Sequence, residues 1–176
     1  TSFNSYICLK FKSITLIKSI SGIRGTIGGF PGNNLTPLDV VKYVSAYGMW
    51  LKSRSNVKIK VVVGRDARIS GLLVQNIVDS TLQLLGIDVI DLGLSTTPTV
   101  EIAVPMEKAS GGIILTASHN PKQWNALKLL NEKGEFLSAN DGDEILRIAE
   151  EENFEYAHID DLGLVEKKDY LQKHIN

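Results

Sequence analysis

The sequence predicts an α/β fold, a three-layer α/β/α domain with a mainly parallel (mixed) sheet. Short β-branched and apolar segments alternate with segments whose apolar residues recur at helical spacing. Right-handed crossovers between such strands place helices on both faces of one sheet. The chain has 176 residues and is 43% hydrophobic, which suits one domain with a substantial core and the beginning of another.

The alternating elements can be placed in order along the chain. Strands are expected at 16–20, 57–63, 87–92, 112–116 and 126–130. A glycine-rich loop is expected at 21–29, between the first strand and the first helix. Helices are expected from 37 to about 51, from about 74 to 85, from 99 to 108, and from 141 to about 152.

The helix ends carry recognisable capping residues. Thr36 can cap the first helix, and Pro37 suits its first position. Gly86 stands where a left-handed cap would end the second helix. Asp141 is expected to cap the fourth helix, with Glu144 as its capping-box partner.

The same pattern divides the chain into three parts. Residues 1–13 are expected to be an N-terminal extension, and residues 14–155 the α/β domain. Residues 156–176 are polar and irregular at first, and we expect a linker followed by the start of a second domain. A helix is expected to begin near Lys167.

Composition excludes several classes of partner. Lys and Arg number 19 and Asp and Glu 20, so the net charge of -1 gives no reason to expect nucleic acid or an anionic membrane. No apolar run approaches the ~18 residues of a membrane span, and the N-terminus lacks the pattern of a signal peptide. A single cysteine, Cys8, permits no intramolecular disulfide. We therefore expect a cytoplasmic protein.

Polar and basic side chains gather in the loops that should follow the strands. In open α/β sheets, ligands bind outside the carboxyl ends of the strands. Arginine suits phosphate oxygens because its planar fork can donate two hydrogen bonds at once. The loops therefore predict an anion-handling site. They carry Arg24, Arg65 with Asp66 and Arg68, Ser95 with Thr96 and Thr97, and Ser118 with His119.

The loop after the strand at 112–116 is the most informative one. Asn120 precedes Pro121 and is pushed out of the helical region, which favours a turn that presents Ser118 outward. From the residues alone, a turn serine that bonds its own backbone is the favoured interpretation.

The segment Thr116-Ala117-Ser118-His119-Asn120-Pro121 resembles the phosphoserine loop of the α-D-phosphohexomutases. Ala126 is a departure, because family members often have glycine there. Asp141-Gly142-Asp143 is similar to the start of the family's metal loop but lacks its third aspartate and its arginine, so helix capping is the better interpretation. Further segments resemble the family in the same order, namely 21–25, 64–71, 95–99, Asn125 and Lys128.

The resemblance implies a role for several residues. Ser118 would carry the transferred phosphoryl group, and a phosphoryl oxygen on Ser118 would be a ligand of Mg²⁺. His119 would contact the substrate or help in proton transfer, or make only an orienting hydrogen bond. Lys128 and Arg24 would be the basic residues at the reacting hydroxyl. For the Arg65–Arg68 turn, an internal ion pair and substrate contact both remain open.

The resemblance further implies the first of four domains of an isomerase that interconverts hexose 1-phosphate and hexose 6-phosphate through a bisphosphate. Glucose, mannose and glucosamine phosphates all remain open as substrates. Domains II–IV of the parent chain would supply the remaining groups, so we expect this chain alone to be inactive and its exposed apolar surface to favour self-association. Two alternatives remain, a serine hydrolase and a non-catalytic sugar-phosphate-binding module. The sequence lacks the Gly-x-Ser-x-Gly motif that many serine hydrolases carry.

Overall fold

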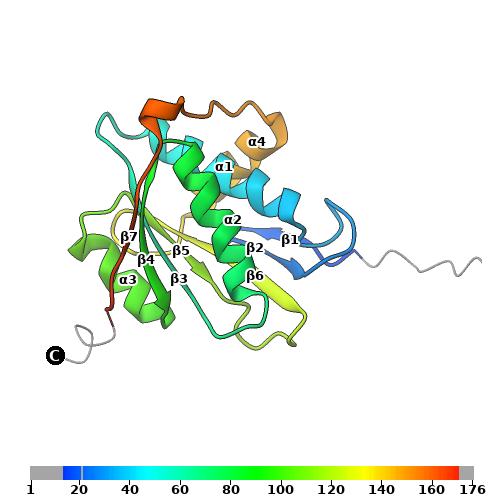
Figure 1. Ribbon diagram of the computed structural model, residues 1–176. Coiled ribbons are helices and arrows are strands. Elements are labelled where there is room, and N and C mark those ends of the chain that lie inside the picture. Colours follow the sequence, from blue (N-terminus) through cyan, green and yellow to red (C-terminus); the bar gives the residue numbers. More distant parts are fainter. Residues whose placement is uncertain (1–13, 21, 171–176) are drawn as a thin grey trace, which may run out of the picture.

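A seven-stranded sheet forms the centre of the computed structural model, which describes residues 14–20 and 22–170 (Figure 1). The predicted extension at 1–13 lies outside the described residues. The strands lie side by side in the order β1-β2-β6-β5-β3-β4-β7. Their bounds are β1 Ile17–Ser19, β2 Gly22–Thr26, β3 Lys60–Arg65, β4 Asp88–Leu94, β5 Gly111–Leu115, β6 Trp124–Leu130 and β7 Val165–Lys167.

The sheet has a parallel half and an antiparallel half. β5, β3, β4 and β7 run parallel to one another, as expected for strands joined by crossover connections. β1, β2 and β6 pair antiparallel, and β6 also runs antiparallel to β5. The mixed sheet confirms the predicted fold class and brings β6 back alongside β5.

Helices cover both faces of the sheet, as predicted. α1, α2 and α4 share one side, where α1 packs on both of the others, and α3 lies on the opposite side (Figure 1). Within the described residues, none of these helices combines the length and apolar character that a bilayer span needs. Their bounds are α1 Pro37–Ser53, α2 Gly71–Leu84, α3 Thr97–Met106 and α4 Ala139–Glu151.

The smaller helical layer leaves part of its sheet face open. α3 packs on β3 and β5, over a core that contains Val62, Ile114 and Val104. Farther along the same face, β2 and β6 present Arg24 and Lys128 to a hollow instead of to a helix. The half-covered face is therefore the place where polar chemistry can be supported by a rigid sheet.

Two of the three helix ends with a predicted cap follow the prediction. Thr36 and Asp39 form a capping box at the start of α1, and Gly86 follows α2 with φ of 76°. The predicted cap of α4 was wrong. Ser138 is the N-cap, and its hydroxyl accepts from the backbone N–H of Asp141 while it donates to the Asp141 carboxylate.

Two segments adopt a different structure from the one predicted. The glycine-rich segment expected to be a loop contains β2, because Gly22–Thr26 pairs with β1 on one side and β6 on the other. The helix expected to begin near Lys167 is absent from residues 165–170, where β7 pairs with β4. In both cases hydrogen bonds to a neighbouring strand override a local pattern that favours something else. The division at 155/156 stays a prediction.

Candidate active site

Ser118 stands just beyond a rigid, buried strand. All five residues of β5 are buried, and Ser118 is exposed. Its backbone is left-handed, with φ of 50°, an uncommon conformation for a residue with a side chain. The turn is closed locally, because Ser118 N–H donates to Thr116 Oγ1 at 3.1 Å and Asn120 N–H donates to the Ala117 carbonyl at 3.0 Å. The serine is thus both a turn residue and an outward-facing hydroxyl.

Lys128 contacts the Ser118 hydroxyl directly. The chain reverses after Pro121 and returns as β6, which places Lys128 opposite Ile114 of β5. The Lys128 ammonium donates to Ser118 Oγ at 3.0 Å. It also lies 5.9 Å from the centre of the Phe136 ring, within range of a cation–π interaction. A basic group is therefore in hydrogen-bond contact with the proposed phosphoryl-bearing oxygen.

All four predicted site residues line one hollow of about 510 Å³. Arg24 lies on β2 opposite Ala126, so the alternation of side chains along the two strands places Arg24, Ala126 and Lys128 on one face. The described lining contains the basic side chains of Arg24 and Lys128 and no carboxylate, a combination that favours an anionic ligand. The lining residues are Arg24, Thr116, Ala117, Ser118, His119, Asn120, Pro121, Ala126, Lys128 and Phe136.

The internal ion pair, one of the two interpretations left open for the turn after β3, is present. Arg68 Nε donates to the Asp66 carboxylate at 3.2 Å, and the Asp66 carboxylate also accepts from the backbone N–H of Arg68. The rest of the Arg68 guanidinium points at the Ser118 loop and donates to its backbone carbonyls. Arg68 therefore belongs to the support of the site.

Two other residues of the predicted rim, Arg65 and Thr96, lie away from the hollow at Ser118. Arg65 lines a separate hollow with Asp91 and Lys167. Thr96 caps α3, where its Oγ1 accepts from the backbone N–H of Thr99 at 3.3 Å.

Phe136 is a site residue that sequence reasoning missed. It follows β6 after a tight turn, and an isolated bridge pairs it with Leu130, so the chain folds back toward the hollow. No periodicity marks it, because it lies outside a regular element. Asn125 was noted only for its spacing. It is fully buried, and its amide donates to Ser70 Oγ at 3.0 Å.

The residues around Ser118 do not form a metal centre by themselves. Within the described residues, no group of three or more His, Cys, Asp or Glu side chains could hold a metal ion. The hollow offers hydroxyl oxygens and cations, whereas Mg²⁺ prefers several oxygen ligands that include carboxylates or phosphates. A phosphoryl group on Ser118 is the one strong ligand that this loop could add.

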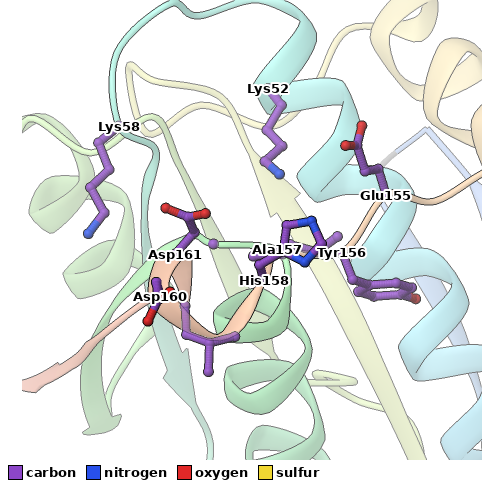
Figure 2. Close-up of a pocket in the computed structure, with 11 residues that line it drawn as sticks. Lys52, Lys58, Glu155, Tyr156, Ala157, His158, Asp160 and Asp161 are labelled. Carbon is purple, nitrogen blue, oxygen red and sulfur yellow. The ribbon is translucent and has the colours of Figure 1, made fainter.

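A second hollow of about 580 Å³ lies at the amino-terminal ends of β3 and β4 (Figure 2). Figure 2 shows Lys52 at the end of α1, Lys58 before β3, and Asp160 and Asp161 from the short 3₁₀ helix. Its charges oppose one another, and Lys58 already pairs with Asp88 at 2.9 Å. This lining of mixed charge contrasts with the basic lining of the hollow at Ser118. The hollow lies where residues 155–162 pack against the end of α1 and the segments before β3 and β4.

Comparison with known proteins agrees with this geometry. The family model of phosphoglucomutase/phosphomannomutase, alpha/beta/alpha domain I, matches residues 16–156. A phosphoglucomutase/phosphomannomutase of Thermococcus kodakarensis is 35% identical over 153 residues, which are 86% of this chain and 34% of that protein. A phosphoglucosamine mutase of Albidiferax ferrireducens is 37% identical over 116 residues, 66% of this chain and 25% of that protein.

A solved structure supports the fold. The phosphoglucomutase/phosphomannomutase family protein of Burkholderia thailandensis has a TM-score of 0.75 at 22% identity, over 93% of this chain and 34% of that one. This chain thus spans about a third of the length of such relatives. The match of the family model over most of the chain shows that the chain belongs to the phosphoglucomutase/phosphomannomutase family, as its α/β/α domain I.

Proposed function

We propose that this chain is the phosphoserine-bearing domain of a phosphohexomutase, with Ser118 as the residue that carries the phosphoryl group. The observation that carries the proposal is the Ser118 hydroxyl, which is exposed in a cationic hollow and 3.0 Å from the Lys128 ammonium. A phosphoserine dianion at this position would meet positive charge from Lys128 and Arg24. Membership of the family supports the same role.

The proposed reaction consists of two phosphoryl transfers. In the first, the bond between phosphorus and Ser118 Oγ breaks, and a free hydroxyl of a hexose 1- or 6-phosphate forms the new bond to phosphorus. The hydroxyl proton passes to a base, the departing Ser118 Oγ takes up a proton to become a free hydroxyl, and the sugar becomes a bisphosphate. In the second, Ser118 takes back the other phosphoryl group, so the sugar phosphate is isomerised without net hydrolysis.

Each predicted side chain has a place in this scheme. Lys128 would hold or accept the proton at the reacting oxygen, because it already contacts Ser118 Oγ. Arg24 stays charged at any ordinary pH, so it would stabilise phosphoryl oxygens rather than accept a proton. His119 lines the same hollow and would contact the sugar or relay a proton. Mg²⁺ bound to phosphorylated Ser118, with its other ligands outside this chain, would neutralise charge on the transferred group.

The remaining parts of the proposed enzyme would come from domains II–IV of a longer cytoplasmic parent protein. The relatives are about three to four times as long as the segments that match this chain, which supports this interpretation. Their names include phosphoglucomutase, phosphomannomutase and phosphoglucosamine mutase, so glucose, mannose and glucosamine phosphates are all candidate substrates.

The test uses the parent protein with Ser118→Ala and a matched control, Ser80→Ala, which removes an exposed serine of α2. We expect S118A to lose mutase turnover on all three sugar phosphates with Mg²⁺ by at least about 1,000-fold, because the transferred group has no carrier. S80A should match the wild type. Intact mass should show one phosphoryl group on the wild type and none on S118A, and this 176-residue chain alone should be inactive.

The outcomes separate the alternatives. Full activity of S118A would refute the phosphoserine role and favour a non-catalytic binding module. Labelling of Ser118 by a serine-hydrolase probe, without phosphate at that residue, would favour a hydrolase. In a hydrolase, Ser118 would be the nucleophile and Lys128, which contacts it, the base. Turnover by this chain alone at the rate of the parent would refute the fragment interpretation.

A further inference from the structure

Every N–H group of the Arg68 guanidinium is used inside the protein. Nη2 donates to the carbonyls of Ser118 and Asn120, both at 2.8 Å. Nη1 donates to the carbonyls of Pro121 at 2.9 Å and Trp124 at 3.0 Å. Nε donates to the Asp66 carboxylate. A guanidinium has five N–H groups, so no donor is left for a substrate phosphate.

The four carbonyls enclose the turn that carries Ser118. They begin at Ser118 and end at Trp124, the first residue of β6, so the guanidinium fixes the whole reversal between β5 and β6. The left-handed backbone conformation of Ser118 costs free energy, so it persists only where the surrounding structure enforces it. The side chain of Arg68 is only 12% exposed, and its hydrogen bonds to the Asn120 and Trp124 carbonyls are partly buried.

The segment around Arg68 is itself fastened to the sheet. Asp66 N–H donates to the Leu115 carbonyl at 3.0 Å, at the end of β5. Ser70 Oγ accepts from the Asn125 amide at 3.0 Å, at the start of β6. The segment that carries Arg68 is therefore hydrogen-bonded to the strands on both sides of the Ser118 loop, at the end of β5 and at the start of β6.

We propose that Arg68 is a positioning residue that holds Ser118 Oγ toward Lys128 and thereby sets the rate of phosphoryl transfer without contacting the sugar phosphate. This inference rests on the proposed function of Ser118. Lysine cannot replace the arginine fully, because three donors on a single nitrogen cannot reach four carbonyls arranged around a planar fork. The charge would survive in Arg68→Lys, but the geometry of the turn would not.

The experiment measures kcat and KM for a hexose 1-phosphate in the parent protein with Arg68→Lys, Arg68→Gln and the control Arg54→Gln. Arg54 is an exposed arginine whose ion pair with Asp141 lies away from the hollow. We expect R68Q to lower kcat by about 100-fold and R68K by about 10-fold, because a misplaced nucleophile loses most of its orientation advantage. KM should change less than about threefold, and R54Q should match the wild type.

Amide hydrogen exchange supplies a readout that does not depend on turnover. In R68K, exchange should accelerate in 117–124, while the helix α1 and the strand β3 should exchange as in the wild type. A raised KM with unchanged kcat would make Arg68 a substrate-binding group and overturn the inference, as would unchanged kcat and unchanged loop exchange. If the wild type has no mutase activity the proposed function fails, and loop exchange in R68K still decides whether Arg68 positions Ser118.

Discussion

At the scale of single residues, the site depends on Ser118, whose backbone adopts an uncommon left-handed conformation, and on the groups that hold its hydroxyl in place. The sequence could identify Ser118, His119, Lys128 and Arg24, because their segments resemble a known family, and the structure places all four around one hollow. The sequence could not assign Arg68, because its partners are backbone carbonyls, which every residue carries. Phe136 was equally hidden, since a turn rather than a repeat brings it to the hollow.

Lys128→Met in the parent protein is the residue-scale prediction. Methionine keeps much of the side-chain length but removes the ammonium that donates to Ser118 Oγ at 3.0 Å. We expect turnover of hexose phosphate to fall by roughly 100- to 10,000-fold, the usual contribution of a proton-transfer group. The matched control is Lys122→Met, which removes an exposed lysine of the same loop and should leave kcat within twofold. Equal losses in both variants would mean that Lys128 contributes only general positive charge.

At the scale of helices and strands, local patterns predicted the parallel half of the sheet better than the antiparallel half. β3 and β4 are largely buried strands between helices, and β5 is a buried strand that follows α3, so the periodicity of the helices marks where these strands lie. Gly22–Thr26 looks like a loop because it contains two glycines, and it becomes β2 only through pairing with strands distant in sequence. Arg24 therefore reaches the hollow from the middle of a strand, whereas the sequence suggested a loop at its end.

The packing of α2 on β4 places two carboxylates close together. Asp79 of α2 has a buried Oδ1 with no hydrogen-bond partner among the described residues. Burial, and then the negative charge of Asp91, raise the pKa of Asp79 to about 7, against smaller opposing effects of Gln75 and Lys167. An unfolded chain loses this proton near the ordinary value of 3.8. Ionised Asp79 therefore destabilises the fold, and this contribution grows as pH rises from about 4 to 7.

Asp79→Asn is the element-scale prediction. Asparagine does not titrate, so the variant should be more stable than the wild type at pH 8, by on the order of 2 kcal/mol, and should lose most of that advantage near pH 4. Chemical unfolding followed by circular dichroism at several pH values measures the difference. The control is Asp143→Asn, at an exposed aspartate of α4. A stability gain of D79N that does not depend on pH would contradict the assignment.

At the scale of the whole molecule, the unequal helical layers decide where chemistry can occur. Three helices cover one face of the sheet, and α3 covers only part of the other. Among the residues that the structure describes, the hollow at Ser118 therefore has the sheet for its floor and no helix in its lining. The sequence predicted both layers but not their extents, because the extent depends on which strands each helix packs against. A site open on this side is suited to closure by another domain, in agreement with the proposed four-domain parent.

The last described residues attach to the opposite edge of the sheet. β7 adds to β4, and Lys168 N–H donates to the Asp91 carbonyl at 2.9 Å. Tyr170 is buried and its hydroxyl donates to the Glu107 carboxylate, which Lys168 also approaches at 2.7 Å. These contacts give the predicted boundary at 155/156 a direct test.

A chain that ends at Glu155 should be less stable than the 176-residue chain. Removal of residues 156–176 exposes the edge of β4 and the apolar surface that Tyr170 covers. We therefore expect a midpoint of thermal unfolding lower by more than about 5 °C. The exposed edge should also increase self-association in sedimentation at high concentration. Equal melting temperatures and equal sedimentation for both chains would instead support residue 155 as the end of the folded unit.

The antiparallel return of β6 also limits how natural chains can vary in length. Ser118 and Lys128 belong to one hairpin, in which Ile114 lies opposite Lys128 and Leu115 opposite Leu127. Adding or deleting one residue within 124–127 would rotate the lysine to the covered side of the sheet and bring a leucine to the hollow. In functional homologues, single-residue gaps should therefore be confined to the turn at 119–123 or be compensated by a bulge.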